Sequence, residues 1–196
     1  IQLLGIYGLG FVGVGTNVLD PAYADPSVPK TSVIRSNTAD SNVLSVKAMG
    51  YPNITLTRAE TYGALQTGVM DGTFGNAPQQ IHDSFRDVVK YYIYYKTIAE
   101  NNEIMINKET YEKLPADYQK ILSDACLEEC IASFDEAEEN DAMYMKKLEE
   151  YGIEVITLTE EELKTVSDAI KVAVWPVMEE QMTSEVMDVV RADAGL

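Results

Sequence analysis

The stretch AETYGALQTGVMDG, residues 59–72, is the most informative part of this sequence. Thr57 stands two positions before it, and Glu60 completes a capping box with Thr57 for a helix that begins at Arg58. Gly68 is suited to end this helix in a left-handed conformation. The stretch therefore predicts one short helix whose two ends are both defined by local signals.

Short strands and helices alternate around this helix. Residues 31–35 are a β-branched segment typical of a strand, residues 37–49 have the apolar spacing of a helix, and residues 53–56 are the next predicted strand. This alternation indicates βαβ units, so we predict an α/β fold with a largely parallel sheet. Further strands are expected over residues 1–7, 91–95, 103–106 and 153–158, a turn over 72–78 and a helix over 81–90.

A long helix is predicted in the second half of the chain. Pro115 suits the first position of a helix, and the helical pattern continues to Tyr151, where Gly152 stops it. Its ~36 residues would extend about 54 Å at ~1.5 Å per residue, so this helix should cross more than one lobe. A second capping box over residues 159–162 begins a helix that meets Pro176, and the remaining tail is again amphipathic.

The composition is that of an acidic protein. The 196 residues carry a formal net charge of −17, which argues against nucleic acid as a partner, because phosphate backbones are bound by Lys and Arg. Electrostatic fields decay over ~8 Å at physiological salt, so one sheltered arginine can still attract a small anion. The sequence contains no run of 18 apolar residues that would predict a membrane-spanning helix.

Three local patterns have a structural explanation that is simpler than a chemical one. Residues 8–13 fit G-x-G-x-x-G after a strand, but the prolines that follow exclude the helix that a dinucleotide site requires. Cys126 and Cys130 stand four apart in a helical stretch, where their Cβ atoms are badly placed for a disulfide, so we expect them to be core or semi-buried residues that fill space. His82 is the only histidine, and we expect it to be a packing or surface residue.

Enzymatic motifs are absent from the sequence. It has no G-x-S-x-G, H-E-x-x-H or Walker motif, so no enzyme, cofactor or metal centre is predicted. The acidic groups at 128–129, 135–139 and 160–162 run along helices, as they do on solvated faces, and no calcium loop is visible. The tyrosines over residues 91–95 alternate along a strand, so about half of them should be in the core.

Arg35 differs from the other charged residues because it ends an apolar, β-branched strand. In an open α/β sheet the carboxyl ends of the strands line the ligand crevice. A guanidinium at that place recognises a carboxylate through two parallel charge-assisted hydrogen bonds. The alternative is a structural salt bridge between Arg35 and one of the many acidic residues.

Arg35 and the stretch at 59–72 together resemble the ligand-binding core of the TRAP-type (tripartite ATP-independent periplasmic transporter) solute-binding proteins, the DctP family. In that family a strand that ends in arginine is followed some twenty residues later by a segment like AETYGALQTGVMDG. The resemblance also covers Gly10-Phe11-Val12 with Thr16-Asn17, residues 85–92, and residues 106–111 with Leu114-Pro115.

The resemblance implies a two-lobed periplasmic-binding-protein-like fold of type II, with one long helix bracing the lobes. We expect residues 1–90 to form the ligand-binding lobe, 91–114 a return segment to the other lobe, 115–152 the bracing helix, and 153–196 a C-terminal strand and helices. Family members extend further at the N-terminus, so we expect that an N-terminal part is missing here, together with any export signal or lipid anchor.

The resemblance also implies a function. A receptor of this family would bind a small organic acid, such as a dicarboxylate, in the cleft between its lobes. It would deliver the acid to the membrane permease subunits of a TRAP transporter. We expect such a receptor to be periplasmic or held at the outer side of a membrane, to be monomeric, and to use no cofactor and no covalent chemistry.

Five positions follow from the family pattern. The carboxylate-clamping arginine of the family matches Arg35, whereas its second arginine is replaced by Val12 in this sequence. We hypothesise that Arg58 replaces the lost cation; the alternative is that Arg58 is an exposed residue of the first helical turn. The ligand asparagine of the family falls on Gly75, with Asn76 one place later.

Four further residues are secondary candidates near the ligand. Asn37, Thr38 and Tyr62 offer amide and hydroxyl groups to ligand oxygens. We interpret Glu60 as architectural, either as part of the capping box or as a group that orients one of the two arginines.

Two other functions stay open at this point. An enzyme acting on a carboxylate needs a titratable group near Arg35, and the sequence offers only Glu60 or Asp71. A carboxylate sensor needs a signalling domain in addition to the binding site.

Overall fold

The computed structural model describes residues 1–194; Gly195 and Leu196, the end of the predicted C-terminal region, lie outside the described residues. The strands are β1 (Gln2–Phe11), β2 (Gly13–Thr16), β3 (Ile34–Ser36), β4 (Asn53–Thr55), β5 (Gly72–Asn76), β6 (Tyr91–Tyr94), β7 (Ala99–Ile106) and β8 (Glu154–Thr157). The helices are α1 (Asp40–Ala48), α2 (Arg58–Thr67), α3 (Pro78–Ser84), α4 (Lys108–Glu112), α5 (Ala116–Tyr151), α6 (Glu160–Gln181) and α7 (Ser184–Asp193).

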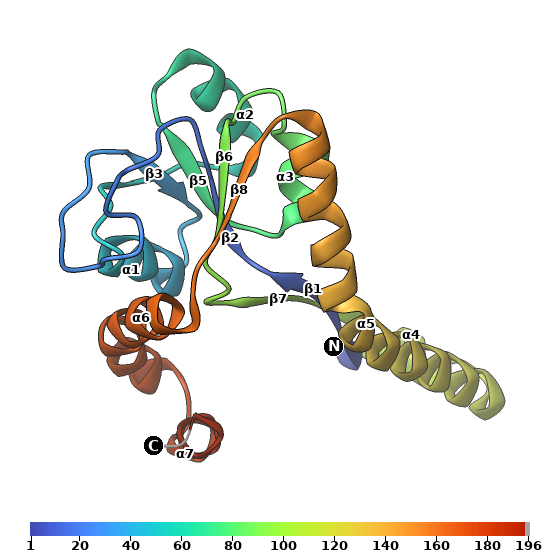
Figure 1. Cartoon of the computed structure of the whole chain (residues 1–196). Helices are drawn as coiled ribbons and strands as arrows, with labels where there is room; N and C mark the ends of the chain where they lie inside the picture. Colours follow the sequence, from blue (N-terminus) through green and yellow to red (C-terminus); the bar gives the residue numbers. More distant parts are fainter. Residues whose placement is uncertain (195–196) are drawn as a thin grey trace.

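The strands form two sheets, which Figure 1 shows one above the other. The larger sheet has the order β4-β3-β5-β2-β6-β8, and the smaller sheet pairs β1 with β7. β3 is parallel to β4 and β5, and β6 is parallel to β8, but β2 is antiparallel to both of its neighbours. The prediction of a largely parallel sheet was therefore wrong at the centre, because β2 enters the larger sheet directly from β1.

Residues 72–78 do not form the predicted turn. Residues 72–76 are the central strand β5, which lies between β3 and β2. A Cβ atom on Gly72 would lie 2.7 Å from the carbonyl oxygen of Gly15, so the close approach of a neighbouring strand explains the glycine here. The predicted helix at 81–90 is also shifted: α3 begins at Pro78 and ends at Ser84.

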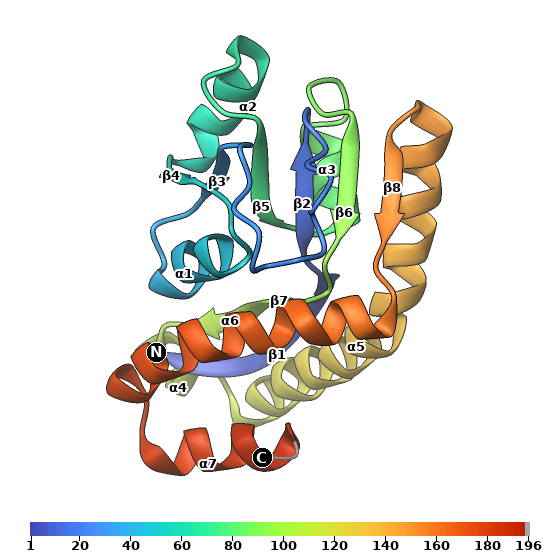
Figure 2. The same cartoon turned by 60° about the vertical axis from the view of Figure 1, so that its left-hand side comes forward.

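Helices cover both faces of the larger sheet (Figure 2). One apolar cluster joins the sheet to α1 and α6, through residues such as Val46, Phe74 and Ile170. The other joins it to α2, α3 and the end of α5, through residues such as Leu65 and Leu148. Each face of the larger sheet therefore has its own apolar core beneath the helices that cover it, as expected for a sheet that is buried on both sides.

The long helix is confirmed. α5 runs from Ala116 to Tyr151 over 36 residues and ends at Gly152, which has a φ of 105°. It packs against β1 of the smaller sheet as well as against α3 and β8 of the larger part. One rigid element therefore reaches both sheets, whereas the predicted division into lobes stays a prediction; residues 1–90 contribute strands to both sheets.

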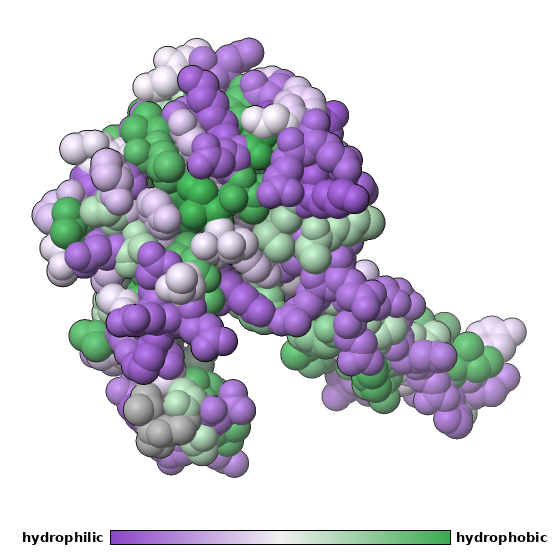
Figure 3. Space-filling model, in the orientation of Figure 1, coloured by the Kyte–Doolittle hydropathy of each residue, from purple (hydrophilic) through white to green (hydrophobic). Residues whose placement is uncertain are grey.

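The outer part of α5 exposes apolar side chains, which Figure 3 shows as green atoms on the projecting helix. The large apolar residues exposed there are Tyr118, Ile121, Leu127, Ile131 and Phe134. None of the helices among residues 1–194 is both long and apolar enough to cross a membrane.

The cysteines and tyrosines lie as predicted. Cys126 and Cys130 are free thiols, and Cys130 is buried against Gly5 of β1. Tyr92 and Tyr95 are fully buried, whereas the other two tyrosines of residues 91–95 are half-buried.

Candidate functional site

The carboxyl ends of β3, β4 and β5 lie along one edge of the larger sheet, because these three strands are parallel. β2 begins at the same edge, where Gly13 lies opposite Asn76. The connection from β6 to β7 also passes here: the amide of Val12 donates to the carbonyl of Ile98 at 3.0 Å, and its carbonyl accepts from the amide of Lys96 at 3.1 Å. We call this border of the sheet the carboxyl edge.

Arg35 is buried at the carboxyl edge, with 8% of its surface exposed. Its Nε and Nη2 both donate to the carbonyl oxygen of Leu56, at 2.9 and 2.6 Å. Among residues 1–194 no carboxylate forms an ion pair with it, so the structure lacks the salt bridge that was the alternative explanation. Burial, followed by the charge of Arg58, lowers the pKa of the Arg35 guanidinium.

Arg58 is the first residue of α2 and is exposed. Its charge acts on Arg35, and in the described part of the chain it has no ion-pair partner either. Two neighbouring cations, one of them buried and neither neutralised by an acid, are electrostatically unfavourable unless an anion joins them. The structure therefore brings together the two arginines that the sequence analysis singled out.

Asn37 and Thr38 follow β3 at the carboxyl edge, and both are exposed. The Asn37 Oδ1 accepts from the amide of Ala39 at 3.0 Å, which leaves its NH₂ group available. Asn76 is buried, with its Nδ2 donating to Thr73 Oγ1 at 3.2 Å, so this side chain already has a partner within the protein.

Glu60 has the architectural role predicted for it. Its carboxylate accepts from the amide of Thr57 at 2.9 Å and from the Thr57 hydroxyl at 2.6 Å, which confirms the capping box. Tyr62 lies apart from the arginines: its hydroxyl donates to Asp87, and it lines a different hollow beside Asn17. Glu60 thus fixes the start of α2, whereas Tyr62, on the same helix, lines a different hollow.

A hollow of about 250 Å³ lies at the carboxyl edge, and we call it the edge hollow. It is lined by Val12, Asn37, Asn42, Gly75, Ile98, Ala99, Glu100 and Asn101. Gly75 has a φ of 86°, a conformation that favours glycine. The sequence analysis missed Asn42, Glu100 and Asn101, because no local pattern shows that α1 and the start of β7 meet here.

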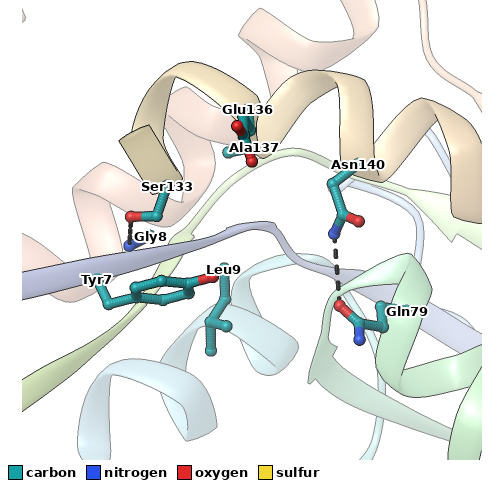
Figure 4. Close-up of a pocket in the computed structure, with 8 residues that line it drawn as sticks. All are labelled: Tyr7, Gly8, Leu9, Gln79, Ser133, Glu136, Ala137 and Asn140. Atoms are coloured by element: carbon teal, nitrogen blue, oxygen red, sulfur yellow. Dashed lines mark hydrogen bonds between the residues drawn. The ribbon is translucent and has the colours of Figure 1, made fainter. Parts of the chain in front are cut away.

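A second hollow of about 280 Å³ lies between α3, β1 and α5 (Figure 4). Ser133 Oγ accepts from the amide of Gly8 at 2.9 Å, and Asn140 Nδ2 donates to Gln79 Oε1 at 3.4 Å. The one charged residue lining it is Glu136. Ser133 and Asn140 are thus engaged within its lining and its charge is negative, so this hollow is a poor match for an organic acid.

The two connections between the sheets are held by α5. Asp141, which is 1% exposed, accepts from the amide of Phe11 at 2.8 Å and from the hydroxyl of Tyr94 at 2.7 Å. One turn earlier Glu138 forms an ion pair with Lys96 at 2.7 Å. Phe11 and Tyr94 are the last residues of β1 and β6, and Lys96 lies in the second connection, so one segment of α5 fixes both connections.

A model of the family described as bacterial extracellular solute-binding protein, family 7 (DctP) matches residues 2–181. A TRAP periplasmic solute binding protein from Sulfitobacter sp. NAS-14.1 with bound β-D-galacturonate is 24% identical, with a TM-score of 0.78 over 96% of this chain and 61% of that chain. One from Shewanella oneidensis with bound succinate is 22% identical, with a TM-score of 0.80 over 97% and 61%. One from Desulfovibrio salexigens with bound orotic acid is 19% identical, with a TM-score of 0.80 over 97% and 60%.

These comparisons confirm the family resemblance and the periplasmic-binding-protein-like fold class predicted from the sequence. At such identities the solved structures establish the fold alone. The chain spans about 60% of the length of these solved proteins. The family and the solved proteins are solute-binding proteins, not enzymes.

Proposed function

Since the chain belongs to the bacterial extracellular solute-binding proteins of family 7, we propose that it is part of a periplasmic receptor that binds a small organic acid at the carboxyl edge. The receptor delivers this acid to the permease subunits of a TRAP-type transporter. It acts as a monomer, and its specificity for the acid is set by the residues of the carboxyl edge together with the other lobe.

The observation that carries this proposal is that Arg35 is buried, lies near a second cation and has no acidic partner among residues 1–194. A buried guanidinium whose pKa is lowered by burial and by Arg58 is stabilised by any anion that joins it. A carboxylate is suited to this place because it accepts from the planar fork at two points. Leu56 holds the fork in place through two hydrogen bonds to its carbonyl oxygen.

The other residues have supporting roles in the proposed site. Arg58 replaces the cation that the family has at the position of Val12 and holds a second oxygen of the ligand. Asn37, Thr38 and the backbone at Gly75, next to Asn76, offer hydrogen bonds from strand ends at the same edge. Glu60 contributes indirectly, since it fixes the start of α2 on which Arg58 stands.

The mechanism is closure of the two lobes around the ligand. We propose that residues 1–90 and the other lobe both contact the acid, with residues 91–114 as the return segment and α5 as the brace between lobes. Only contacts that are stronger in the closed form than in the open form can drive closure. Asp141 and Glu138 hold the two connections at which such a closure would bend.

Neither residue that could have served an enzyme as the titratable group near Arg35 is free for that role. Asp71 stands just before β5, and its carboxylate is engaged there because it accepts from the amide of Val33 at 2.7 Å. Glu60 is engaged by Thr57.

A thermal-shift screen of the full-length protein tests the proposal. Small carboxylates and their uncharged amides are compared on the wild type, on Arg35→Ala, and on the control Arg86→Ala, whose guanidinium donates to the His82 carbonyl elsewhere. A ligand at about a hundred times its Kd adds ~2.7 kcal/mol of stability. A carboxylate-specific shift that is lost only in Arg35→Ala supports the proposal, and shifts that are equal for acid and amide contradict it.

A further inference from the structure

Glu100 and Gln80 form a hydrogen-bonded pair beside the edge hollow. Gln80 Nε2, in the first turn of α3, donates to Glu100 Oε1, on β7, at 2.8 Å. The other oxygen of each side chain, Glu100 Oε2 and Gln80 Oε1, is shielded from solvent and accepts no hydrogen bond from residues 1–194. Two acceptors within one pair of side chains are thus left without a donor.

Such acceptors are uncommon in folded proteins. Most buried polar atoms are hydrogen-bonded, and leaving one without a partner costs a large part of its desolvation free energy. Glu100 also has no ion-pair partner in the described part of the chain. It is nevertheless the one charged residue that lines the edge hollow, whose other polar lining residues are Asn37, Asn42 and Asn101.

The strand order places this pair away from the two arginines. Along the carboxyl edge the strands follow the order β4, β3, β5, β2. Arg58 follows β4, Arg35 is on β3, and Val12 stands at the start of β2, where it bonds to Ile98 just before β7. Two strand spacings of ~4.8 Å separate β3 from β2, about 10 Å across the sheet. Arg35 lies level with Thr73 and Gly15, three residues from Val12, which adds about 10 Å along the strands at ~3.3 Å per residue. A small molecule that lies between the long side chains of Arg35 and Glu100 can therefore contact both.

We propose that the acid bound here carries hydrogen-bond donors, hydroxyls or an ammonium, at the end opposite its carboxylate, and that Glu100, held by Gln80, accepts from them. This inference rests on the proposed function, since it places the carboxylate on Arg35. A second carboxylate at that end would face Glu100, and like charges at short range repel each other. The expected substrate class is a donor-bearing monocarboxylate rather than a plain dicarboxylate.

Four acids with six carbons in an unbranched chain test this inference on the full-length protein. Hexanoate has no further polar group, gluconate adds hydroxyls, 6-aminohexanoate adds an ammonium, and adipate adds a second carboxylate. Their Kd values are measured on the wild type, on Glu100→Gln, and on Glu103→Gln as a matched control. Glu103 is exposed on the same strand and does not line the edge hollow.

On the wild type, gluconate or 6-aminohexanoate should bind about tenfold or more tightly than hexanoate and adipate, as expected for a hydrogen bond to a charged group. Glu100→Gln should remove most of this preference and tighten adipate, whereas Glu103→Gln should preserve the ranking. Preference for gluconate identifies hydroxyls as the donors, and preference for 6-aminohexanoate identifies an ammonium.

Two results would overturn the inference alone. One is that hexanoate or adipate binds the wild type at least as tightly as the donor-bearing acids. The other is that Glu100→Gln leaves the ranking unchanged, which would make the pair structural, with water on its free oxygens. If none of the four acids binds although the thermal-shift screen finds a carboxylate that does, the inference fails as well. If binding of an acid survives in Arg35→Ala, the proposed function itself fails.

Discussion

The carboxylate of Asp141 accepts a hydrogen bond at 2.8 Å from the backbone amide of Phe11, which lies 130 residues earlier in the chain. The same oxygen, Oδ2, accepts from the Tyr94 hydroxyl at 2.7 Å. Phe11 leads into the first connection between the sheets and Tyr94 into the second. A single side chain on the long helix therefore fixes both connections between the two sheets.

Asp141 should give the stability of the protein a specific pH dependence. Burial raises the pKa of Asp141 above 3.8, against smaller lowering effects from the Phe11 amide, the Tyr94 hydroxyl and Lys96. The native state then binds this proton more tightly than the unfolded state, so the contribution of Asp141 is greatest below about pH 4 and declines as the pH rises through its raised pKa. Asp141→Asn lacks this titration.

The free energy of unfolding of the wild type, minus that of Asp141→Asn, should therefore decrease from about pH 4 to about pH 7. Urea unfolding of both proteins at these two pH values measures the difference. Neighbouring groups such as Glu138 titrate in both proteins and largely cancel. A difference that stays constant or grows with pH would contradict the account.

Gly10→Ala should strongly destabilise the protein. Gly10 has a φ of 106°, and a Cβ atom there would overlap the Asp141 carboxylate. We expect a loss of about 2 kcal/mol or more, since both the backbone conformation and the space exclude a side chain. Gly63→Ala is the control, because nothing lies within 4 Å of its Cβ position in α2, and it should add up to about 1 kcal/mol. Equal effects of the two changes in chemical denaturation would refute this reading of Gly10.

Signals close together in the sequence predicted the helices well. Thr57, Glu60 and Gly68 defined both ends of α2, and Gly152 defined the end of α5, because capping depends on residues within a few positions of each other. The central strand β5 was mistaken for a turn, since its Gly-rich sequence becomes a strand only through pairing with β2 and β3.

The two arginines of the candidate site were singled out from the sequence because each falls within a segment of the family pattern. They lie near each other because Arg58 begins the helix that follows β4, the parallel neighbour of β3. Glu100 and Asp141 gained their roles from contacts with distant segments, namely with Gln80 of α3 and with Phe11 of β1. No periodicity or motif in the sequence reports such long-range pairs.

Arg58→Ala should weaken binding of the acid by about tenfold or more. The variant loses a cation that lies next to Arg35 and has no acidic partner among residues 1–194, so an anionic ligand loses one charge-assisted contact. Calorimetric titration of the full-length protein measures the change, with Arg86→Ala as the control. Unchanged affinity would return Arg58 to the role of an exposed residue in the first helical turn.

Tyr62→Phe should leave the affinity for the acid unchanged within about twofold. The Tyr62 hydroxyl donates to Asp87 and not toward the arginines. We expect little change in the free energy of unfolding, because this exposed hydrogen bond competes with water. A tenfold loss of affinity would instead place Tyr62 in contact with the ligand, as its sequence position first indicated.

The most direct test of the account is a crystal structure of the full-length protein in complex with an acid that it binds. The account predicts that the ligand carboxylate lies on the guanidinium of Arg35, with two N–H···O hydrogen bonds of about 2.8 Å, at the carboxyl ends of β3 and β5. An acid bound elsewhere, with Arg35 still donating only to the carbonyl of Leu56, would contradict it.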